Sequence, residues 1–468
     1  MTSIAEKTFA EQSSIRSVVN FCKKYNVGRA LKHAGAYKQK GISSLTIIKY
    51  LIALVYTGKS MFEDLRSPTP LAQGFRKDAV YRFLNQMHVS WQAFQLNIAS
   101  RVVADINKLT SETRRSAFVV DDTIFSILYA KRTELVSKIY DHAAKVGSKY
   151  KWGFRMLTLG WTDGASFIPL TFRHLASSDE KKQRCGSISN LDKRSRAYRL
   201  RKEAVLKAAE VMIVQLKAAL RAGITARYVL FDTWYAFPTS IIKIKDMGLH
   251  VVARVKDTSK IRYLVDGEKK SAREIYRANR KRRGKSRYLL SIAISLYTTV
   301  DGHEVRIPAK LVYVRNKQKR NDWIALVSTD TEMSEDDIIA LYGKRWDIEV
   351  FFKICKSYLK LAGEFNQLSY DAITAHTAIV MLRYMILSVE KRTQEDPRTL
   401  GELFFLGFDE ATDVKFEWAL VLIMSLLADV LKDADLGLTE EQMEAIMDSF
   451  IRKLPYDIRL CLQPNFAA

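Results

Sequence analysis

The chain has 468 residues, which is long enough for a sizeable hydrophobic core and for two or three domains. It carries 75 lysines and arginines against 51 aspartates and glutamates, a formal net charge of +24. This charge favours a polyanionic partner, meaning DNA, RNA or an anionic membrane, over a basic surface that is merely solvated. The cysteines and histidines are dispersed, which argues against a zinc module or a disulfide framework and fits a reducing cytoplasm. The cysteines are Cys22, Cys185, Cys355 and Cys461.

The two most apolar stretches, residues 44–58 and 416–431, are both shorter than the roughly 20 charge-free residues that span a bilayer. Lys49 also interrupts the first of them. The chain begins without a basic segment followed by an apolar core, so no signal peptide is expected. We therefore expect a cytoplasmic protein without a membrane partner.

Residues 1–112 are expected to form a helical region. Apolar residues in 43–58 and 78–109 recur with the 3.6-residue period of an amphipathic helix, and a loop with proline and glycine at 66–75 separates them. The basic side chains of this region make it a candidate DNA-binding domain, although it has no sharp helix-turn-helix signature.

Strand signals begin at residue 113. Short apolar runs rich in β-branched residues indicate buried strands, and the Asp-Gly pair at 163–164 indicates a hairpin. A long amphipathic helix is expected at 192–221 and a second helix near 236–247. The expected strands are 117–120, 151–161, 166–175, 226–232 and 249–255. Because strands come first and then alternate with helices, residues 113–255 are expected to form the first part of an α/β sandwich around a central sheet.

Residues 256–321 interrupt this alternation with β-rich sequence surrounded by cations, and we expect them to be an insertion. The core then resumes with a strand at 322–329 and one continuous helix over 334–360, for which Ser334 is the expected N-cap. The residues after this helix are expected to be helical. The expected division of the chain after residue 255 is therefore 256–321, 322–390 and 391–468.

Two aspartates directly follow buried strands: Asp121 comes after AFVV, and Asp232 after RYVLF. Sites in α/β folds form where strands end, although an aspartate there is also a common turn or cap residue. A third carboxylate, Glu349, lies on the expected helix among cations and beside an apolar stripe. Three carboxylates from separate elements beside a basic surface are what two-metal phosphoryl transfer requires, because hard oxygen ligands bind Mg²⁺.

The cations near Glu349 share its helix face. At about 100° per residue, an arc of roughly 60° holds four side chains: Tyr342, Arg345, Glu349 and Lys356. In one interpretation, Arg345 and Lys356 bind phosphates on either side of a metal centre. The alternative is an exposed ion pair of Arg345 with Glu349, which requires neither of the other two residues. Trp346 is expected to pack against the protein rather than to stack on a base.

These four residues have the spacing Y-x₂-R-x₃-E-x₆-K, and the sequence resembles bacterial insertion-sequence transposases of the DDE class, which carry this Y-R-E-K signature. The resemblance covers residues 114–385 and includes the order of the acids, with the glutamate after a β-rich insertion. It implies an α/β (α+β) fold with an RNase H-like mixed sheet flanked by helices. The family pattern Asp-x-Ser/Thr fits Asp121 with Thr123 and does not fit Asp122. Neighbouring side chains of a strand face opposite ways, so only one of the two aspartates can serve, and we select Asp121.

The resemblance also implies roles and partners. The implied catalytic residues and metal ligands are Asp121, Asp232 and Glu349. The implied DNA-binding residues are Tyr342, Arg345 and Lys356. The implied cofactor is Mg²⁺, with Mn²⁺ as the alternative. The implied activity is cleavage of double-stranded DNA at terminal inverted repeats and strand transfer to a target, by a homodimer in a paired-end complex in the bacterial cytoplasm, at the nucleoid.

Other functions remain as alternatives. An RNase H-like nuclease would use the same acids without assembling paired ends. A non-catalytic, domesticated DNA-binding protein would not need the acids, so their presence argues against it. A covalent recombinase is disfavoured because the signature accounts for Tyr342 and no second Arg/His constellation accompanies it. The basic runs 181–202 and 277–287 are candidates for contacting DNA outside the core.

Overall fold

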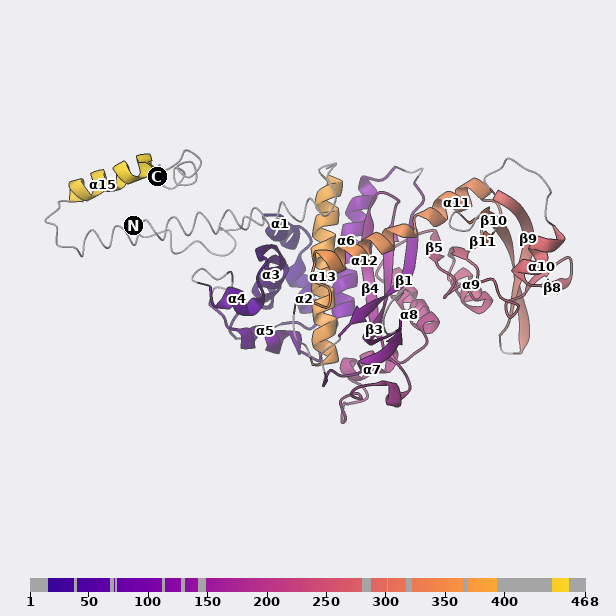
Figure 1. Ribbon diagram of the computed structural model, residues 1–468, viewed down its shortest axis with the longest axis horizontal. Coiled ribbons are helices and arrows are strands. Elements are labelled where there is room, and N and C mark those ends of the chain that lie inside the picture. Colours follow the sequence, from indigo (N-terminus) through magenta and orange to yellow (C-terminus); the bar gives the residue numbers. More distant parts are fainter. Residues whose placement is uncertain are drawn as a thin grey trace.

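Figure 1 shows the computed structural model of the chain. The structure describes residues 16–37, 40–67, 71, 74–111, 114–127, 131–141, 149–279, 288–300, 302–316, 322–364, 368–393 and 440–453. Some of the predictions from sequence lie outside these residues. They concern the first 15 residues, the apolar stretch at 416–431, residues 280–287 of the second basic run, and most of the expected helical segment 391–468.

The N-terminal part of the described chain is helical, as its apolar periodicity predicts. Its helices are α1 (Arg16–Lys24), α2 (Val27–His33), α3 (Ser44–Leu54), η1 (Val55–Thr57), α4 (Met61–Leu65), α5 (Lys77–Leu84) and α6 (Trp91–Lys108). Serine N-caps begin three of them, because the side chains of Ser43, Ser60 and Ser90 each accept a backbone N–H from the first turn. Most of α3 is buried, which explains why it is nearly all apolar.

One mixed sheet occupies the centre of the described molecule. Its eleven strands follow the order β2-β3-β1-β5-β6-β11-β10-β9-β7-β8, with β4 paired to β3. They are β1 (Ala117–Ser126), β2 (Ser137–Tyr140), β3 (Tyr150–Thr162), β4 (Phe167–Leu175), β5 (Tyr228–Phe231), β6 (His250–Arg254), β7 (Tyr263–Val265), β8 (Glu268–Lys270), β9 (Tyr288–Val300), β10 (His303–Arg315) and β11 (Trp323–Ser328). β1 is antiparallel to β3 and parallel to β5. The expected α/β fold with a mixed central sheet is confirmed.

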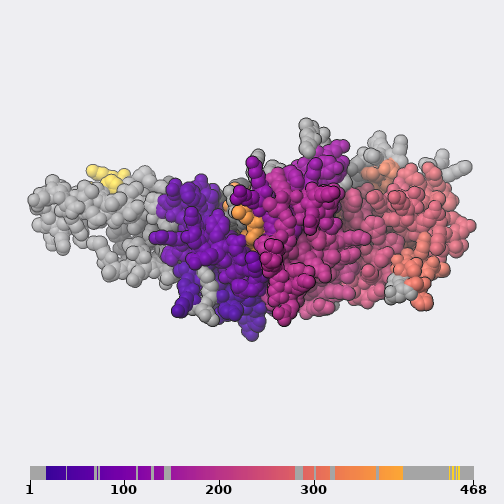
Figure 2. All heavy atoms as spheres, turned by 90° about the horizontal axis from the view of Figure 1, so that it is seen from below, coloured from indigo at the N-terminus to yellow at the C-terminus, as the bar shows by residue number. Residues whose placement is uncertain are grey.

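The β-rich insertion extends this sheet. β9 and β10 form a long antiparallel hairpin, and β10 pairs with β11, the core strand that follows the insertion. In Figure 1 this hairpin lies at the opposite end of the molecule from the N-terminal helices, and Figure 2 shows the same order from below. The core strands β1 and β5 therefore lie between the basic N-terminal helices on one side and the basic β9–β10 hairpin on the other.

α13 (Tyr370–Thr393) is a core helix, and all its residues from Tyr370 to Ser388 are buried. It packs against α6 and β4. Among the described helices it alone is long and apolar enough to cross a membrane, but its apolar window is 100% buried inside the protein. α13 is therefore apolar because it is enclosed by the other elements of the protein.

The other described helices are η2 (Glu180–Lys182), α7 (Arg196–Ala204), α8 (Ala208–Arg221), α9 (Pro238–Lys245), α10 (Ala272–Ala278), α11 (Glu335–Gly343), α12 (Trp346–Ser357) and α15 (Glu440–Lys453). The prediction of one helix over 192–221 was wrong, because α7 and α8 are separate. The carbonyl of Ala204 accepts a hydrogen bond at 2.8 Å from the backbone N–H of Ala176, just after β4, which ends α7. Lys207 then adopts an extended conformation and begins α8.

The prediction of one continuous helix over 334–360 was also wrong. Ser334 caps α11 as expected, but Lys344 and Arg345 form a tight turn between α11 and α12. In this turn the N–H of Arg345 bonds the carbonyl of Tyr342, three residues back, at 3.0 Å. Gly343 is a poor helix former at the end of α11.

A tertiary contact accompanies this turn. The Lys344 amine donates to the backbone carbonyls of Arg115 at 2.9 Å and Asp163 at 3.1 Å. Both carbonyls belong to the sheet region that α12 covers. The turn is therefore fixed to the core, and α12 starts at a position that the sheet determines.

Candidate active site

β1 and β5 place two of the predicted acids side by side. The two strands are parallel and their last register pair is Val120 with Phe231, so Asp121 and Asp232 occupy the next position on each. Equivalent positions on neighbouring parallel strands point to the same face of a sheet. In both cases the next backbone N–H donates to Oδ1 of the aspartate, at 2.8 Å for Asp121 and 2.7 Å for Asp232.

β1 does not end where the sequence predicts. The apolar run stops at Val120, but antiparallel pairing with β3 carries the strand on to Ser126. Only the parallel pairing with β5 stops at Val120. Asp121 therefore lies within a strand, at the point where the neighbouring strand on one side has ended.

Asp122 makes contacts that Asp121 does not share. The Arg155 guanidinium binds it with two hydrogen bonds, of which the one from Nη2 to Oδ1 is 2.8 Å long, and the Tyr235 hydroxyl donates to it at 2.9 Å. Neither Arg155 nor Tyr235 was predicted from the sequence as a partner of Asp122. Arg155 lies in the apolar strand expected at 151–161, and a partly buried arginine there predicts a carboxylate partner. The sequence around Tyr235 has no feature that predicts a hydrogen bond to Asp122.

Arg345 joins Asp121 to Glu349. Its Nη1 donates to Asp121 Oδ2 at 2.9 Å, and its Nη2 donates to Glu349 Oε1 at 2.5 Å. The side chains of Arg345, Asp121 and Glu349 are 13%, 18% and 34% exposed. The pair of Arg345 with Glu349 is thus not the exposed helix pair of the alternative interpretation, because it is largely enclosed and includes a third, distant residue.

Asp121 is a buried carboxyl with one positive and two negative side chains around it. Burial raises the pKa of its carboxyl to about 7, although the positive charge of Arg345 opposes this rise. The charges of Asp122 and Asp232 raise the pKa further, which agrees with the adjacent strand positions of Asp121 and Asp232.

Tyr342 lies near the end of α11 and Lys356 in the last turn of α12, on either side of Arg345 and Glu349 along the chain. The Tyr342 ring centroid lies 5.8 Å from Cζ of Arg345. Burial raises the pKa of Tyr342, which the positive charge of Arg345 opposes and the charge of Asp232 supports. Lys356 Nζ donates to Thr123 Oγ1 at 2.6 Å. Because Thr123 is two residues after Asp121 on the same face of β1, α12 is tied to β1 through both ends.

Comparison with known families bears on these residues. The sequence model of the DDE superfamily endonucleases matches residues 49–321, which is more than half of the chain. The chain belongs to this family. A comparison with curated proteins found no match. The matched range contains Asp121 and Asp232 and ends before Glu349. As a DDE superfamily endonuclease the protein acts on DNA, which agrees with its net charge of +24.

DDE endonucleases generally use divalent metal ions such as Mg²⁺. In the described part of this endonuclease, no group of three or more His, Cys, Asp or Glu side chains is arranged to hold a metal ion. The Arg345 guanidinium donates to both Asp121 and Glu349, two of the three carboxylates that the resemblance implies as metal ligands. The donor set itself fits a hard cation, since it consists of carboxylates, and Oδ2 of Asp232 accepts no hydrogen bond from any described residue.

Trp346 of the endonuclease does not pack as predicted, since it is 61% exposed. The buried residues of α12 are Ile348, Phe351, Phe352, Ile354 and Cys355. At about 100° per residue Trp346 lies roughly 200° from Ile348. The expectation that Trp346 packs against the protein was therefore wrong.

The first basic run also contains structural residues. Arg201, within 181–202, is only 3% exposed and binds the carboxylates of Glu134 and Asp371 at 2.5 and 2.7 Å. A buried arginine with two carboxylate partners does not contact DNA. The exposed cations of the run, such as Arg194, remain candidates for that contact.

Proposed function

We propose that this DDE endonuclease is the transposase of a bacterial insertion sequence. It cuts double-stranded DNA at terminal inverted repeats and joins the freed 3′-OH to a target. The observation that carries the proposal is the enclosed cluster in which one guanidinium, that of Arg345, binds both Asp121 and Glu349 beside Asp232. The spacing of the Y-R-E-K residues on α11 and α12 adds to it.

In this proposal Asp121, Asp232 and Glu349 hold Mg²⁺, or Mn²⁺ as the alternative ion. Two such ions supply the Lewis acidity for in-line displacement at a phosphodiester. The protein's own contribution is to fix three carboxylates on three elements before DNA arrives. Asp121 and Asp232 are fixed by the pairing of β1 with β5, and Glu349 is fixed by the contacts at both ends of α12.

Arg345 has two alternative partners in this proposal. Without DNA it neutralises Asp121 and Glu349. A DNA phosphate offers the same planar guanidinium two hydrogen bonds, so the group can turn from the carboxylates to the phosphate. That exchange uncovers the carboxylate oxygens for ligands at the moment when the DNA is in place.

The flanking residues extend this DNA contact. Lys356 lies about two helical turns from Glu349, roughly 10 Å along α12, where it can bind a phosphate that neighbours the scissile one. Tyr342 packs against Arg345 and limits the directions in which the guanidinium can turn. We also propose that the chain works as a homodimer that pairs two element ends in the bacterial nucleoid.

The family's endonuclease character also supports a simpler function, cleavage without strand transfer. One assay separates the two. The full chain is incubated with a DNA fragment that carries the native element ends and with a target plasmid, in Mg²⁺ and in EDTA. The transposase proposal predicts cut ends and joined plasmid products in Mg²⁺ and neither product in EDTA. Cut ends without joined products would favour the nuclease, and cleavage in EDTA would contradict both.

A further inference from the structure

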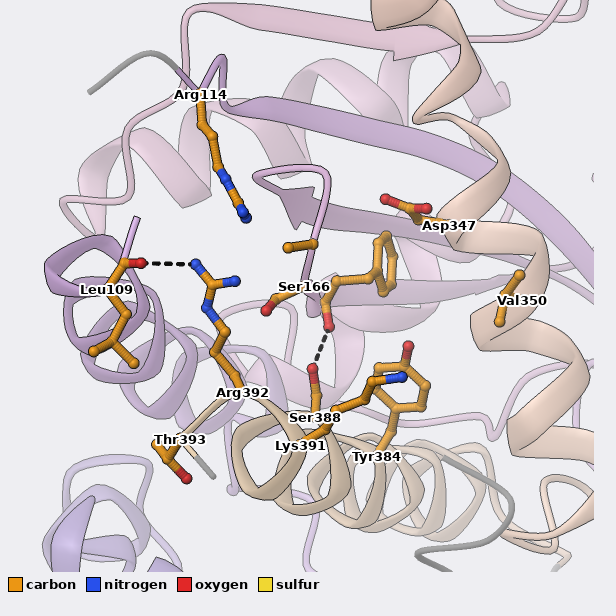
Figure 3. A pocket seen from close by; sticks show the side chains of 12 residues that line it. Leu109, Arg114, Ser166, Asp347, Val350, Tyr384, Ser388, Lys391, Arg392 and Thr393 are labelled. Carbon is orange, nitrogen blue, oxygen red and sulfur yellow. Dashed lines mark hydrogen bonds between the residues drawn. The ribbon is translucent and has the colours of Figure 1, made fainter. Parts of the chain in front are cut away.

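α12 borders a cavity of about 590 Å³, which Figure 3 shows. The cavity lies between the end of α6, the β3–β4 hairpin, α12 and the last turns of α13. Asp347 and Val350 line it from α12. At about 100° per residue Asp347 is roughly 200° from Glu349, so the cavity lies on the other side of α12 from the acid cluster. Its volume is within the roughly 300–1,000 Å³ of small-molecule sites.

Cations from two elements meet at this cavity. Arg114 precedes β1, and Lys391 and Arg392 lie in the last turn of α13. Figure 3 shows the guanidinium groups of Arg114 and Arg392 pointing toward one another. Asp163, whose side chain is fully buried, holds both groups, at 3.2 Å from Arg392 and 3.6 Å from Arg114. The two guanidiniums are therefore positioned by the fold before any ligand arrives.

Arg392 is held in place at this cavity, since its Nη2 also donates to Thr110 Oγ1 at 3.3 Å and to Asp163 Oδ2 at 3.2 Å. Its Nη2 donates to the carbonyl of Leu109 at 2.9 Å, but its Nε is buried and has no hydrogen-bond partner among the described residues. Because this Nε is closed to solvent, it is not a donor for a ligand in the cavity, and Arg392 contributes its positive charge beside Arg114 and Lys391. Tyr384 contributes its side chain to the same wall.

The remaining lining determines the class of ligand. Asp347 Oδ2 accepts a hydrogen bond from Thr162 at 2.7 Å, and the carboxylate borders the cavity, where it can accept from an N–H or O–H of a ligand. Val350 and Leu109 add apolar surface. A bare anion would use the cations alone, whereas a nucleotide has a phosphate for the cations, donors for Asp347, and a sugar or base for the apolar wall.

We propose that this cavity binds one nucleotide unit, with its phosphate against Arg114, Lys391 and Arg392 and its sugar or base against Asp347 and Val350. The phosphate ester comes from a strand of bound DNA or from a free nucleotide. The site is separate from the acid cluster, and its occupation does not require the proposed chemistry. It gives the endonuclease a second contact with nucleic acid on the far side of α12.

The proposal is tested by fluorescence titration of the full chain with ethenoadenosine monophosphate in EDTA. Lys391→Ala and Arg114→Ala each remove one phosphate donor, so each should weaken binding about tenfold or more. Tyr384→Phe keeps the ring and removes only the hydroxyl, with an expected loss of about threefold. Lys243→Ala, at an exposed position of α9, is the matched control and should bind like the wild type.

Competition identifies the source of the nucleotide. A short oligonucleotide that displaces the probe assigns the site to bound DNA, and displacement by free mononucleotides alone assigns it to a soluble nucleotide. The proposal is overturned if no saturable binding occurs, if Lys391→Ala and Arg114→Ala bind like the control, or if inorganic phosphate competes as well as the nucleotide. Glu349→Gln should bind the probe normally, so failure of the transposase proposal leaves this test intact.

Discussion

Arg345 binds two carboxylates with one planar guanidinium, whereas Lys356 makes a single hydrogen bond to Thr123. This difference predicts unequal tolerance of substitutions that keep the charge. Arg345→Lys should lower single-turnover DNA cleavage tenfold or more, because an ammonium cannot replace paired hydrogen bonds to a carboxylate or a phosphate. Lys356→Arg should retain most activity. Equal losses in the two variants would contradict the assigned geometry.

Alanine variants of Arg345 and Lys356 test whether these side chains contact DNA. If Arg345 and Lys356 bind phosphates, each alanine variant should lower the slope of log affinity for DNA against log salt by about one. A purely structural role for Arg345 predicts an unchanged slope together with a lower melting temperature. The slope and the melting temperature of Arg345→Ala, measured together, distinguish the two roles.

Removal of Arg345 should also change metal binding in the absence of DNA. In the wild type a cation must displace the guanidinium from Asp121 and Glu349. Arg345→Ala should therefore bind Mn²⁺ about tenfold more tightly, as measured by electron paramagnetic resonance of the free ion, although it cleaves DNA more slowly. Arg315→Ala, at an exposed position of β10, serves as the control. Equal Mn²⁺ affinity in all three proteins would show that Arg345 does not compete with the ion.

At the scale of elements, Asp163 connects the end of α6, the β3–β4 hairpin and the end of α13. It accepts hydrogen bonds from Thr110 at 2.8 Å and from the backbone N–H of Ser166 at 2.7 Å, and it pairs with Arg392. Burial acts to raise the pKa of Asp163, but these donors and Ala165 outweigh burial, and the pKa is lowered. The charged form of Asp163 is therefore part of the folded state.

This lowered pKa fixes the sign of a pH dependence. A carboxyl with a lower pKa in the folded than in the unfolded chain stabilises the fold above its ordinary pKa near 4, and the contribution disappears as the pH falls through the folded value. Asp163→Asn should therefore lower the free energy of unfolding by on the order of 3 kcal/mol at pH 7, and the difference should shrink below about pH 4. Chemical denaturation of the wild type and of Asp163→Asn, at pH 7 and again below about pH 4, measures the difference in the free energy of unfolding.

Asp266→Asn is the control for that experiment, because Asp266 is exposed and has a positive φ of 49°, which asparagine also tolerates. It should leave stability unchanged at both pH values. An Asp163→Asn deficit that grows as the pH falls would show that Asp163 is protonated in the folded protein.

At the scale of the whole molecule, the sequence predicts what depends on local pattern. Apolar β-branched runs located the buried core strands, and the acids after two of them led to Asp121 and Asp232. Hydrogen bonds between residues far apart in the chain could not be predicted from such local patterns. The contact of Ala176 with Ala204 divides one expected helix, and Lys344 fixes the turn that divides the other.

The candidate site shows the same limit. The Y-R-E-K spacing pointed to Arg345 and Glu349, but only the fold shows that Arg345 reaches Asp121, 224 positions away in the chain. Trp346 was expected to pack against the protein as a large aromatic side chain, whereas it lies on α12 away from the buried residues and is exposed. The cavity beyond α12 is formed by segments from four parts of the chain, and no short motif describes it.

The central claim is that Asp121, Asp232 and Glu349 form one metal-dependent site that cuts DNA. Its most direct test is single-turnover cleavage of native element ends in Mg²⁺ by Glu349→Gln, compared with Glu332→Gln, the same chemical change at an exposed position. The predicted result is a loss of about a hundredfold or more in Glu349→Gln with DNA binding retained, and wild-type cleavage in Glu332→Gln. Cleavage by Glu349→Gln at the wild-type rate would contradict the claim.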